Sequence, residues 1–197
     1  MDSEYDVDIF WSSTQPWSRL GQRSWPSLRF GVSADEALRL FSTDRAAESC
    51  RLLNDALADT IILNSLYNKH YWLIRSEFHC TLERLLCQHA REQIEFIDQL
   101  AQRIHDLGGV AISDPRHVAD AAAIPPTPSG FEDSPAMLYR ILEAHRIIIQ
   151  KLHRVMISAA EKRGEVANQR LMSGMMSRHE RQAWLVAEQL VGTLSNA

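Results

Sequence analysis

The chain has 197 residues, of which 45% are hydrophobic and 23% charged, and its formal net charge at pH 7 is -4. This length allows one domain with a full core. No apolar run approaches the roughly 18 residues of a membrane helix, and the acidic first ten residues do not resemble a secretory signal, so we expect a cytoplasmic protein without a membrane segment. Three cysteines at unrelated spacings do not predict a disulfide framework.

Residues 1–41 differ in composition from the rest of the chain. They begin with alternating acids, and Pro16 and Pro26 exclude a continuous helix. Two interpretations stay open: an arm that docks on a neighbouring subunit or a partner protein, or an extension that packs on its own domain. Either interpretation depends on three tryptophans, which are Trp11, Trp17 and Trp25.

The remaining residues, 42–197, show helical periodicity except in the connection of roughly 25 residues that follows Gly109. Apolar residues recur at i, i+3 and i+4, and no stretch alternates as a strand does. The long predicted helices cover about residues 44–72, 78–107, 134–163 and 166–191, and a short helix is expected at 115–123. We therefore predict an all-α fold: a ferritin-like four-helix bundle with a long crossover, carrying the short helix, between its second and third long helices.

Two local signals support the predicted helix ends. Gly108 and Gly109 follow the second long helix, as glycine does past a helix C-terminus. Ser134 and Pro135 combine a capping residue with a proline in the first turn, which predicts the start of the third long helix.

Three motifs resemble the Dps family of small bacterial ferritins. They are LNDALADTIILNSLYNKHYW at 53–72, FIDQLAQRIHDLGGV at 96–110 and RQAWLVAEQLV at 181–191, and the resemblance covers about residues 44–193. It implies a hollow shell of twelve identical subunits that oxidises Fe(II), preferably with hydrogen peroxide, and stores the ferric mineral. Many members of the family also coat DNA.

The resemblance also implies where the oxidation site would lie, between two subunits related by a twofold axis. The family's two histidine positions fall on Tyr71 and Glu83, its first aspartate falls on Cys87, and its glutamate falls on Gln102. Only Asp98 keeps the residue type of the family ligand. The five positions are the candidate metal ligands of this chain.

The spacing of these residues favours a site between subunits. Glu83, Cys87 and Asp98 lie 4 and 11 residues apart, which puts them on one helical face. Cys87 and Asp98 are nevertheless separated by about 16 Å along that helix. A second copy of the helix under twofold symmetry would bring Asp98 of one chain toward Glu83 and Cys87 of the other.

The donor types predict altered metal chemistry. Glu83 and Asp98 suit one hard divalent cation, whereas the Cys87 thiol shifts selectivity toward zinc or Cu(I) and is exposed to oxidation by peroxide. Gln102 keeps the shape of glutamate without its charge. Our hypothesis is one iron ion per site rather than two, with zinc as an alternative, and slow or absent ferroxidase activity.

A non-enzymatic alternative stays open at this point. The same five residues could form a hydrogen-bonded, metal-free interface in a shell or interaction protein. Residues 1–41 would then bind a partner or a competent paralogous subunit. The position of the Tyr71 ring discriminates between a metal site and a metal-free interface. A ring that fills the pocket would favour the structural role.

We expect no DNA-binding or metal-binding role for the other candidate features of the sequence. Binding of DNA by a tail is not expected, because the N-terminus is acidic and residues 195–197 carry no side-chain charge. The chain contains no Glu-x-x-His, which excludes a di-metal centre of the bacterioferritin type inside one bundle. Methionines at 172, 175 and 176 are expected to fill the core. Surface or helix-capping roles are expected for most histidines, at positions 79, 89, 105, 117, 145, 153 and 179.

Overall fold

The structure is a computed structural model that describes residues 43–74, 80–161 and 165–195. The predictions for residues 1–41, including the three tryptophans of that segment, lie outside these ranges. No helix in the described part of the chain is long and apolar enough to cross a membrane.

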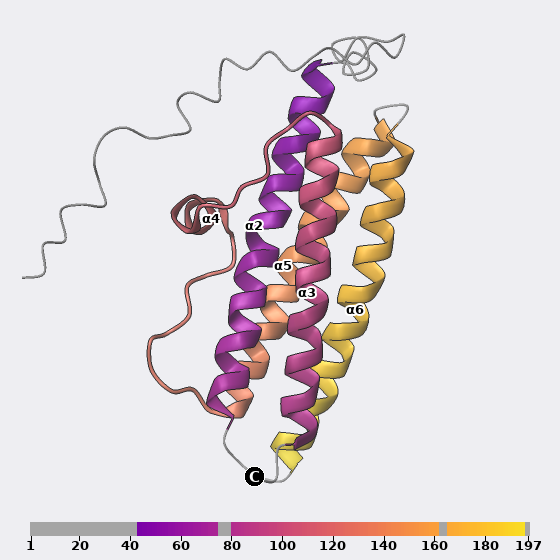
Figure 1. Cartoon of the computed structure of the whole chain (residues 1–197). Coiled ribbons are helices and arrows are strands. Elements are labelled where there is room, and N and C mark those ends of the chain that lie inside the picture. Colours follow the sequence, from indigo (N-terminus) through magenta and orange to yellow (C-terminus); the bar gives the residue numbers. More distant parts are fainter. Residues whose placement is uncertain (1–42, 75–79, 162–164, 196–197) are drawn as a thin grey trace, which may run out of the picture. The chain divides into compact units, whose positions relative to one another are not determined.

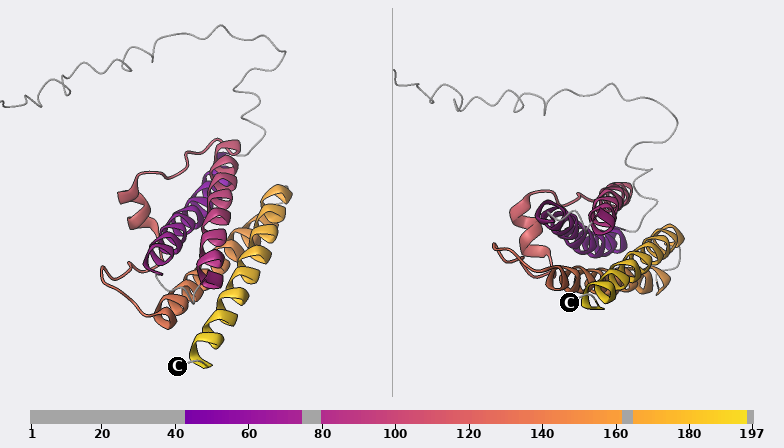
Figure 2. Two further views of the ribbon diagram at one scale, coloured as in Figure 1. Left: turned by 60° about the horizontal axis from the view of Figure 1, so that its bottom comes forward. Right: turned by 90° about the horizontal axis from the view of Figure 1, so that it is seen from below.

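Four long helices form the bundle, in the order α2 (Thr43–Leu73), α3 (Cys80–Asp106), α5 (Ser134–Glu161) and α6 (Val166–Ser195). The closest helix pairs are α2 with α3 and α5 with α6, and α2 also packs against α5 (Figures 1 and 2). The short helix α4 (Pro115–Ala121) lies on the crossover beside α2. The described ranges contain no strand, so the predicted all-α bundle with its long crossover is confirmed.

The C-terminus of α3 has the glycine cap that the sequence predicts. Gly108 has a positive φ of 78°, and its N–H donates to the carbonyl of His105 at 2.8 Å. The N–H of Gly109 donates to the carbonyl of Ile104 at 2.9 Å, which completes a Schellman motif. These bonds satisfy two of the carbonyls that a helix end leaves free.

The start of α5 differs from the sequence prediction. The residue before the helix, Asp133, caps it: its side chain accepts a hydrogen bond from the N–H of Ala136 at 2.8 Å. Ser134 is therefore the first helical residue rather than the cap, and Pro135 follows it in the first turn. A carboxylate is at least as good a cap as a hydroxyl, so either residue satisfies the local pattern.

The core consists mainly of aliphatic side chains from all four long helices. The largest buried side chains are those of Tyr67 and Phe96. Met172 and Met175 are fully buried as well, and Met176 packs against this cluster, which confirms their predicted role in the core. Burial of each large apolar side chain contributes about 1.5–3 kcal/mol, so this core holds the helices in place.

Polar side chains of α2 fix the crossover to the bundle. The buried carboxylate of Asp59 accepts from the backbone N–H groups of Ala123 at 2.7 Å and Ile124 at 2.9 Å, and it forms an ion pair with Lys151 of α5. Near the end of the crossover, Glu132 forms ion pairs with Lys69 of α2 at 3.2 Å and with Arg140 of α5 at 2.6 Å. Both carboxylates tie the crossover to two helices.

Burial alone would raise the pKa of the Glu132 carboxyl. Hydrogen bonds from Arg140 and Lys69 outweigh it and hold that pKa below its usual range. Glu132 is thus charged at neutral pH and keeps both ion pairs.

Candidate metal site on helix α3

A polar cavity on the bundle lies along the N-terminal half of α3. Its volume is about 690 Å³, which is within the size range of ligand pockets. Tyr71 reaches it from the C-terminal end of α2, and all other lining residues come from α3. These residues are Cys80, Glu83, Arg84, Cys87, Gln88, Arg91, Glu92 and Glu95.

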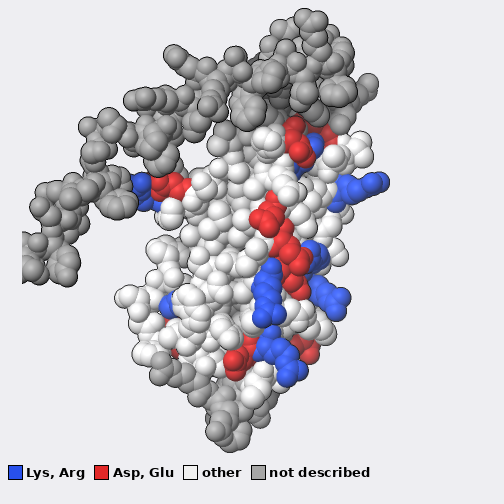
Figure 3. Space-filling view, in the orientation of Figure 1, with Lys and Arg blue, Asp and Glu red and all other residues white. Residues whose placement is uncertain are grey.

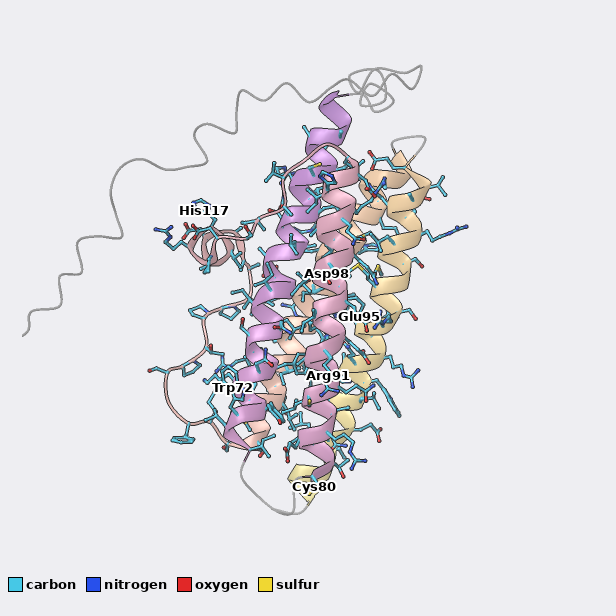
Figure 4. The ribbon with its side chains drawn as sticks, viewed as in Figure 1. Trp72, Cys80, Arg91, Glu95, Asp98 and His117 are labelled. Atoms are coloured by element: carbon cyan, nitrogen blue, oxygen red, sulfur yellow. The ribbon has the colours of Figure 1, made fainter. Side chains whose placement is uncertain are left out.

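The structure brings three of the five candidate ligands together. Tyr71, Glu83 and Cys87 are half-buried and line the same pocket. Asp98 and Gln102 are exposed farther along α3, and Figure 4 shows Asp98 well separated from Cys80 at the start of that helix. In the described residues, no group of three or more histidine, cysteine, aspartate or glutamate side chains is placed to hold a metal ion. Within one subunit, these five residues therefore do not come together as a metal site.

The candidate ligands are not engaged within their own subunit. In the described part of the chain, no hydrogen bond or ion pair involves the side chain of any of the five residues. The phenol, carboxylates, thiol and amide are therefore available to a metal ion or to a second subunit.

Sequence reasoning missed two further carboxylates of the pocket. Glu92 accepts hydrogen bonds from Gln88 at 3.0 Å and from Gln182 of α6 at 2.5 Å, and Glu95 forms an ion pair with Arg178 of α6 at 2.8 Å. Figure 3 shows acidic and basic side chains alternating along this side of the bundle. Glu83, Cys87, Arg91 and Glu95 are spaced by four residues, so helical spacing places Glu95 on the same face as Glu83 and Cys87. This spacing was the sequence pattern from which Glu95 could have been predicted.

The pocket has nearly balanced charge. Three carboxylates, those of Glu83, Glu92 and Glu95, face two guanidinium groups, those of Arg84 and Arg91, which leaves one net negative charge. Because Glu95 is paired with Arg178, and Glu92 is held by two amides, Glu83 is the carboxylate least committed to neighbours.

A second polar cluster lies in the middle of the bundle, and the sequence did not predict it. Each long helix contributes one buried residue: Tyr67, His89, His145 and His179. The Tyr67 hydroxyl lies 2.6 Å from Nε2 of His145 and 3.1 Å from Nδ1 of His89, and the Nδ1 atoms of His145 and His179 lie 3.1 Å apart. The expected surface or capping role is thus wrong for these three histidines, although His105, His117 and His153 are exposed.

Burial keeps these imidazoles neutral. It lowers the pKa of His89 to about 4 and that of His179 to about 3, and it lowers the pKa of His145 well below the usual value. The cluster is therefore uncharged at neutral pH. No spacing rule along one helix could reveal it, because its four members lie on four different helices.

Comparison with known proteins agrees with the observed bundle. Residues 50–193 match the family described as ferritin-like domain. A curated relative, an uncharacterized protein in the bpoA2 5' region of Kitasatospora aureofaciens, is 45% identical over 70% of this chain and 89% of its own length.

Solved structures of the same fold are also similar. DpsC from Streptomyces coelicolor is 42% identical, with a TM-score of 0.73 over 76% of this chain and 87% of its own. The Dps protein of Vibrio cholerae O1, described as a member of a broad superfamily of ferritin-like diiron-carboxylate proteins, is 19% identical and shares the fold with a TM-score of 0.71 over 76% of this chain and 93% of its own. From the bundle, its long crossover and these similarities, the chain belongs to the Dps family of ferritin-like proteins.

Proposed function

We propose that this protein is a cage-forming subunit that sequesters iron and protects against oxidative stress, with a slow ferroxidase site between subunits. The cage would contain twelve identical chains related in part by twofold axes. Fe(II) is the substrate and the ferric mineral is the stored product. Membership of the Dps family supports this function at the level of iron storage and stress protection.

The observation that carries the proposal is an open pocket with uncommitted donors. Tyr71 forms part of the wall of the pocket and does not fill it, since the pocket has a volume of about 690 Å³. Glu83 and Cys87 line the same pocket, and neither makes a hydrogen bond or ion pair in the described part of the chain. An open pocket favours metal binding over a purely structural role.

The donor set limits the chemistry of the proposed site. Glu83 of one subunit and Asp98 of its twofold neighbour would bind one Fe(II), since hard divalent cations prefer carboxylate oxygens. The phenol of Tyr71 and the amide of Gln102 add no negative charge, so a second iron ion lacks sufficient ligands. The Cys87 thiol would raise the affinity for zinc, which is expected to compete with iron.

Anaerobic titration of the sized full-length protein with Fe(II), followed by peroxide and an optical record of ferric oxide, tests the proposal. We expect a particle near twelve times the monomer mass of 22.5 kDa. We further expect one Fe(II) bound per site, with oxidation that is slow but faster than in buffer. Asp98→Ala and Glu83→Ala should each weaken binding at least tenfold, because each removes one of two charged ligands.

The matched control is Asp106→Ala, which removes an exposed carboxylate from the same helix and should leave binding unchanged. A cage-sized particle that neither binds Fe(II) nor accelerates its oxidation would contradict the proposal and favour a structural shell. Two Fe(II) per site with rapid peroxide consumption would contradict the one-metal hypothesis.

A further inference from the structure

The buried cluster of Tyr67, His89, His145 and His179 places a phenol between two imidazoles. The side chain of Tyr67 is 0% exposed, and its ring meets the rings of His89 and His145 edge-on, at centroid distances of 5.5 and 5.9 Å. A hydrophobic residue would fill such a core position with no polar groups to satisfy. The cluster instead builds one continuous line of hydrogen bonds through all four long helices.

The direction of these hydrogen bonds depends on the tautomers of the histidines. One consistent set has the Tyr67 hydroxyl donating to Nε2 of His145 across 2.6 Å and accepting from Nδ1–H of His89 across 3.1 Å. In that set, Nδ1–H of His145 donates to Nδ1 of His179. In either direction, the Tyr67 hydroxyl lies within hydrogen-bonding distance of an imidazole nitrogen.

This arrangement gives the phenol proton a base at hydrogen-bonding distance. Burial raises the pKa of Tyr67 well above 10, so the side chain does not lose its proton as an acid at neutral pH. Loss of an electron changes this, since a phenol radical cation is a strong acid. The neutral imidazole of His145 is ready to accept the proton, and His179 stands behind it as a second acceptor.

We propose that Tyr67 is a one-electron redox site that intercepts oxidising radicals formed next to the α3 pocket. The O–H bond of Tyr67 breaks, and its proton moves to Nε2 of His145. The electron reduces a hydroxyl radical to hydroxide. The reaction of Fe(II) with peroxide produces that hydroxyl radical. The product is a neutral tyrosyl radical hydrogen-bonded to an imidazolium. The inference takes its natural oxidant from the proposed function.

The position of Tyr67 suits this role. Tyr71, which lines the pocket, follows it on α2 by one turn, or about 6 Å along the helix axis. Tyr71 is half-buried and Tyr67 is fully buried, so the two phenols lead from the pocket wall into the core. A radical held at Tyr67 is shielded from solvent, because the Tyr67 side chain is 0% exposed.

Freeze-quench electron paramagnetic resonance on the full-length protein tests the inference. Fe(II) and peroxide are mixed, and ferric oxide formation is recorded in parallel. We expect a tyrosyl radical signal, changed by ring-deuterated tyrosine, that falls at least tenfold in Tyr67→Phe and persists in the control Tyr139→Phe, whose ring is exposed. The high-field spectrum of the unmodified protein should show a hydrogen bond to the radical oxygen. This measurement does not depend on whether the Tyr67→Phe variant folds.

The outcomes separate this inference from the proposed function. Iron oxidation without a tyrosyl signal, or with a signal that survives in Tyr67→Phe, overturns the inference and leaves the iron function in place. If Fe(II) is not oxidised at all, the radical is generated instead by flash photolysis of peroxydisulfate in iron-free protein. A Tyr67-dependent signal there supports the redox site although the proposed function fails, and its absence overturns the inference.

Discussion

At the scale of single residues, Asp59 shows how one buried carboxylate positions a long connection. It is 0% exposed, bonds to two backbone N–H groups of the crossover, and forms an ion pair with Lys151, whose side chain is 15% exposed. A buried charge needs such partners, because its removal from water is expensive. The motif LNDALADTIILNSLYNKHYW contains this residue, but its letters do not reveal which distant backbone groups it binds.

Replacement of Asp59 by alanine should strongly destabilise the protein. Asp59→Ala leaves Lys151 without its carboxylate partner and frees two backbone donors, so we expect a loss of about 3–5 kcal/mol in the free energy of unfolding. Urea denaturation at fixed subunit concentration measures it. Asp55→Ala, one turn earlier, removes only an i, i+4 pair with Arg51 and should cost less than about 1 kcal/mol. Equal losses in both variants would show that Asp59 does not anchor the crossover.

At the scale of helices, the end of α3 requires glycine for two reasons: a positive φ at one residue and close packing against α2 at the next. Gly108 supplies the positive φ, and Gly109 lies against Cys50 of α2. A Cβ at Gly109 would lie 2.5 Å from Sγ of Cys50 and 3.0 Å from Cγ2 of Ile104. The second glycine is therefore required by helix packing as well as by the turn.

Gly109→Ala is expected to destabilise the protein by about 1–3 kcal/mol, because Cys50 is buried and must move to make room. Gly174→Ala is the matched control: no atom lies within 4 Å of its added Cβ, and alanine in a helix interior is favoured over glycine by up to about 1 kcal/mol. Thermal unfolding should therefore shift in opposite directions in the two variants. A shift in the same direction would contradict the packing argument.

At the scale of the whole molecule, the buried histidines make the fold sensitive to acid. Their folded pKa values lie below the value of about 6.5 for an unfolded histidine, so the unfolded chain binds more protons. Their contribution to stability is complete above pH 6.5. It is lost as the pH falls, over a window that reaches down to about 3 for His179.

Urea denaturation between pH 6.5 and 5 checks this expectation. For His179 alone, the slope of the free energy of unfolding against pH should approach about 1.4 kcal/mol per pH unit as the pH falls from 6.5 toward 5. His179→Leu should reduce the slope by that amount, whatever it does to stability at pH 7, whereas His153→Leu at an exposed position should leave the slope unchanged. An unaltered slope in His179→Leu would mean that this imidazole is protonated in the folded state.

The sequence by itself determined the helices, the crossover and the family. Period-3.6 patterns and glycine stops are local properties, and the three motifs extend over most of the bundle. It also grouped Tyr71, Glu83 and Cys87, which line one pocket in the structure, because helical spacing places the last two on one face and the family resemblance adds the first.

Only the tertiary structure decided which polar residues meet across helices. Glu92 is held by Gln182, Tyr67 meets His89 and His145, and His145 meets His179. All of these contacts join residues more than 20 positions apart. Even the cap of α5 depended on which of two adjacent polar residues stood just before the first turn. Spacing along one helix specifies a face, but the partner of that face is set by how four helices pack, and this is a property of the folded chain alone.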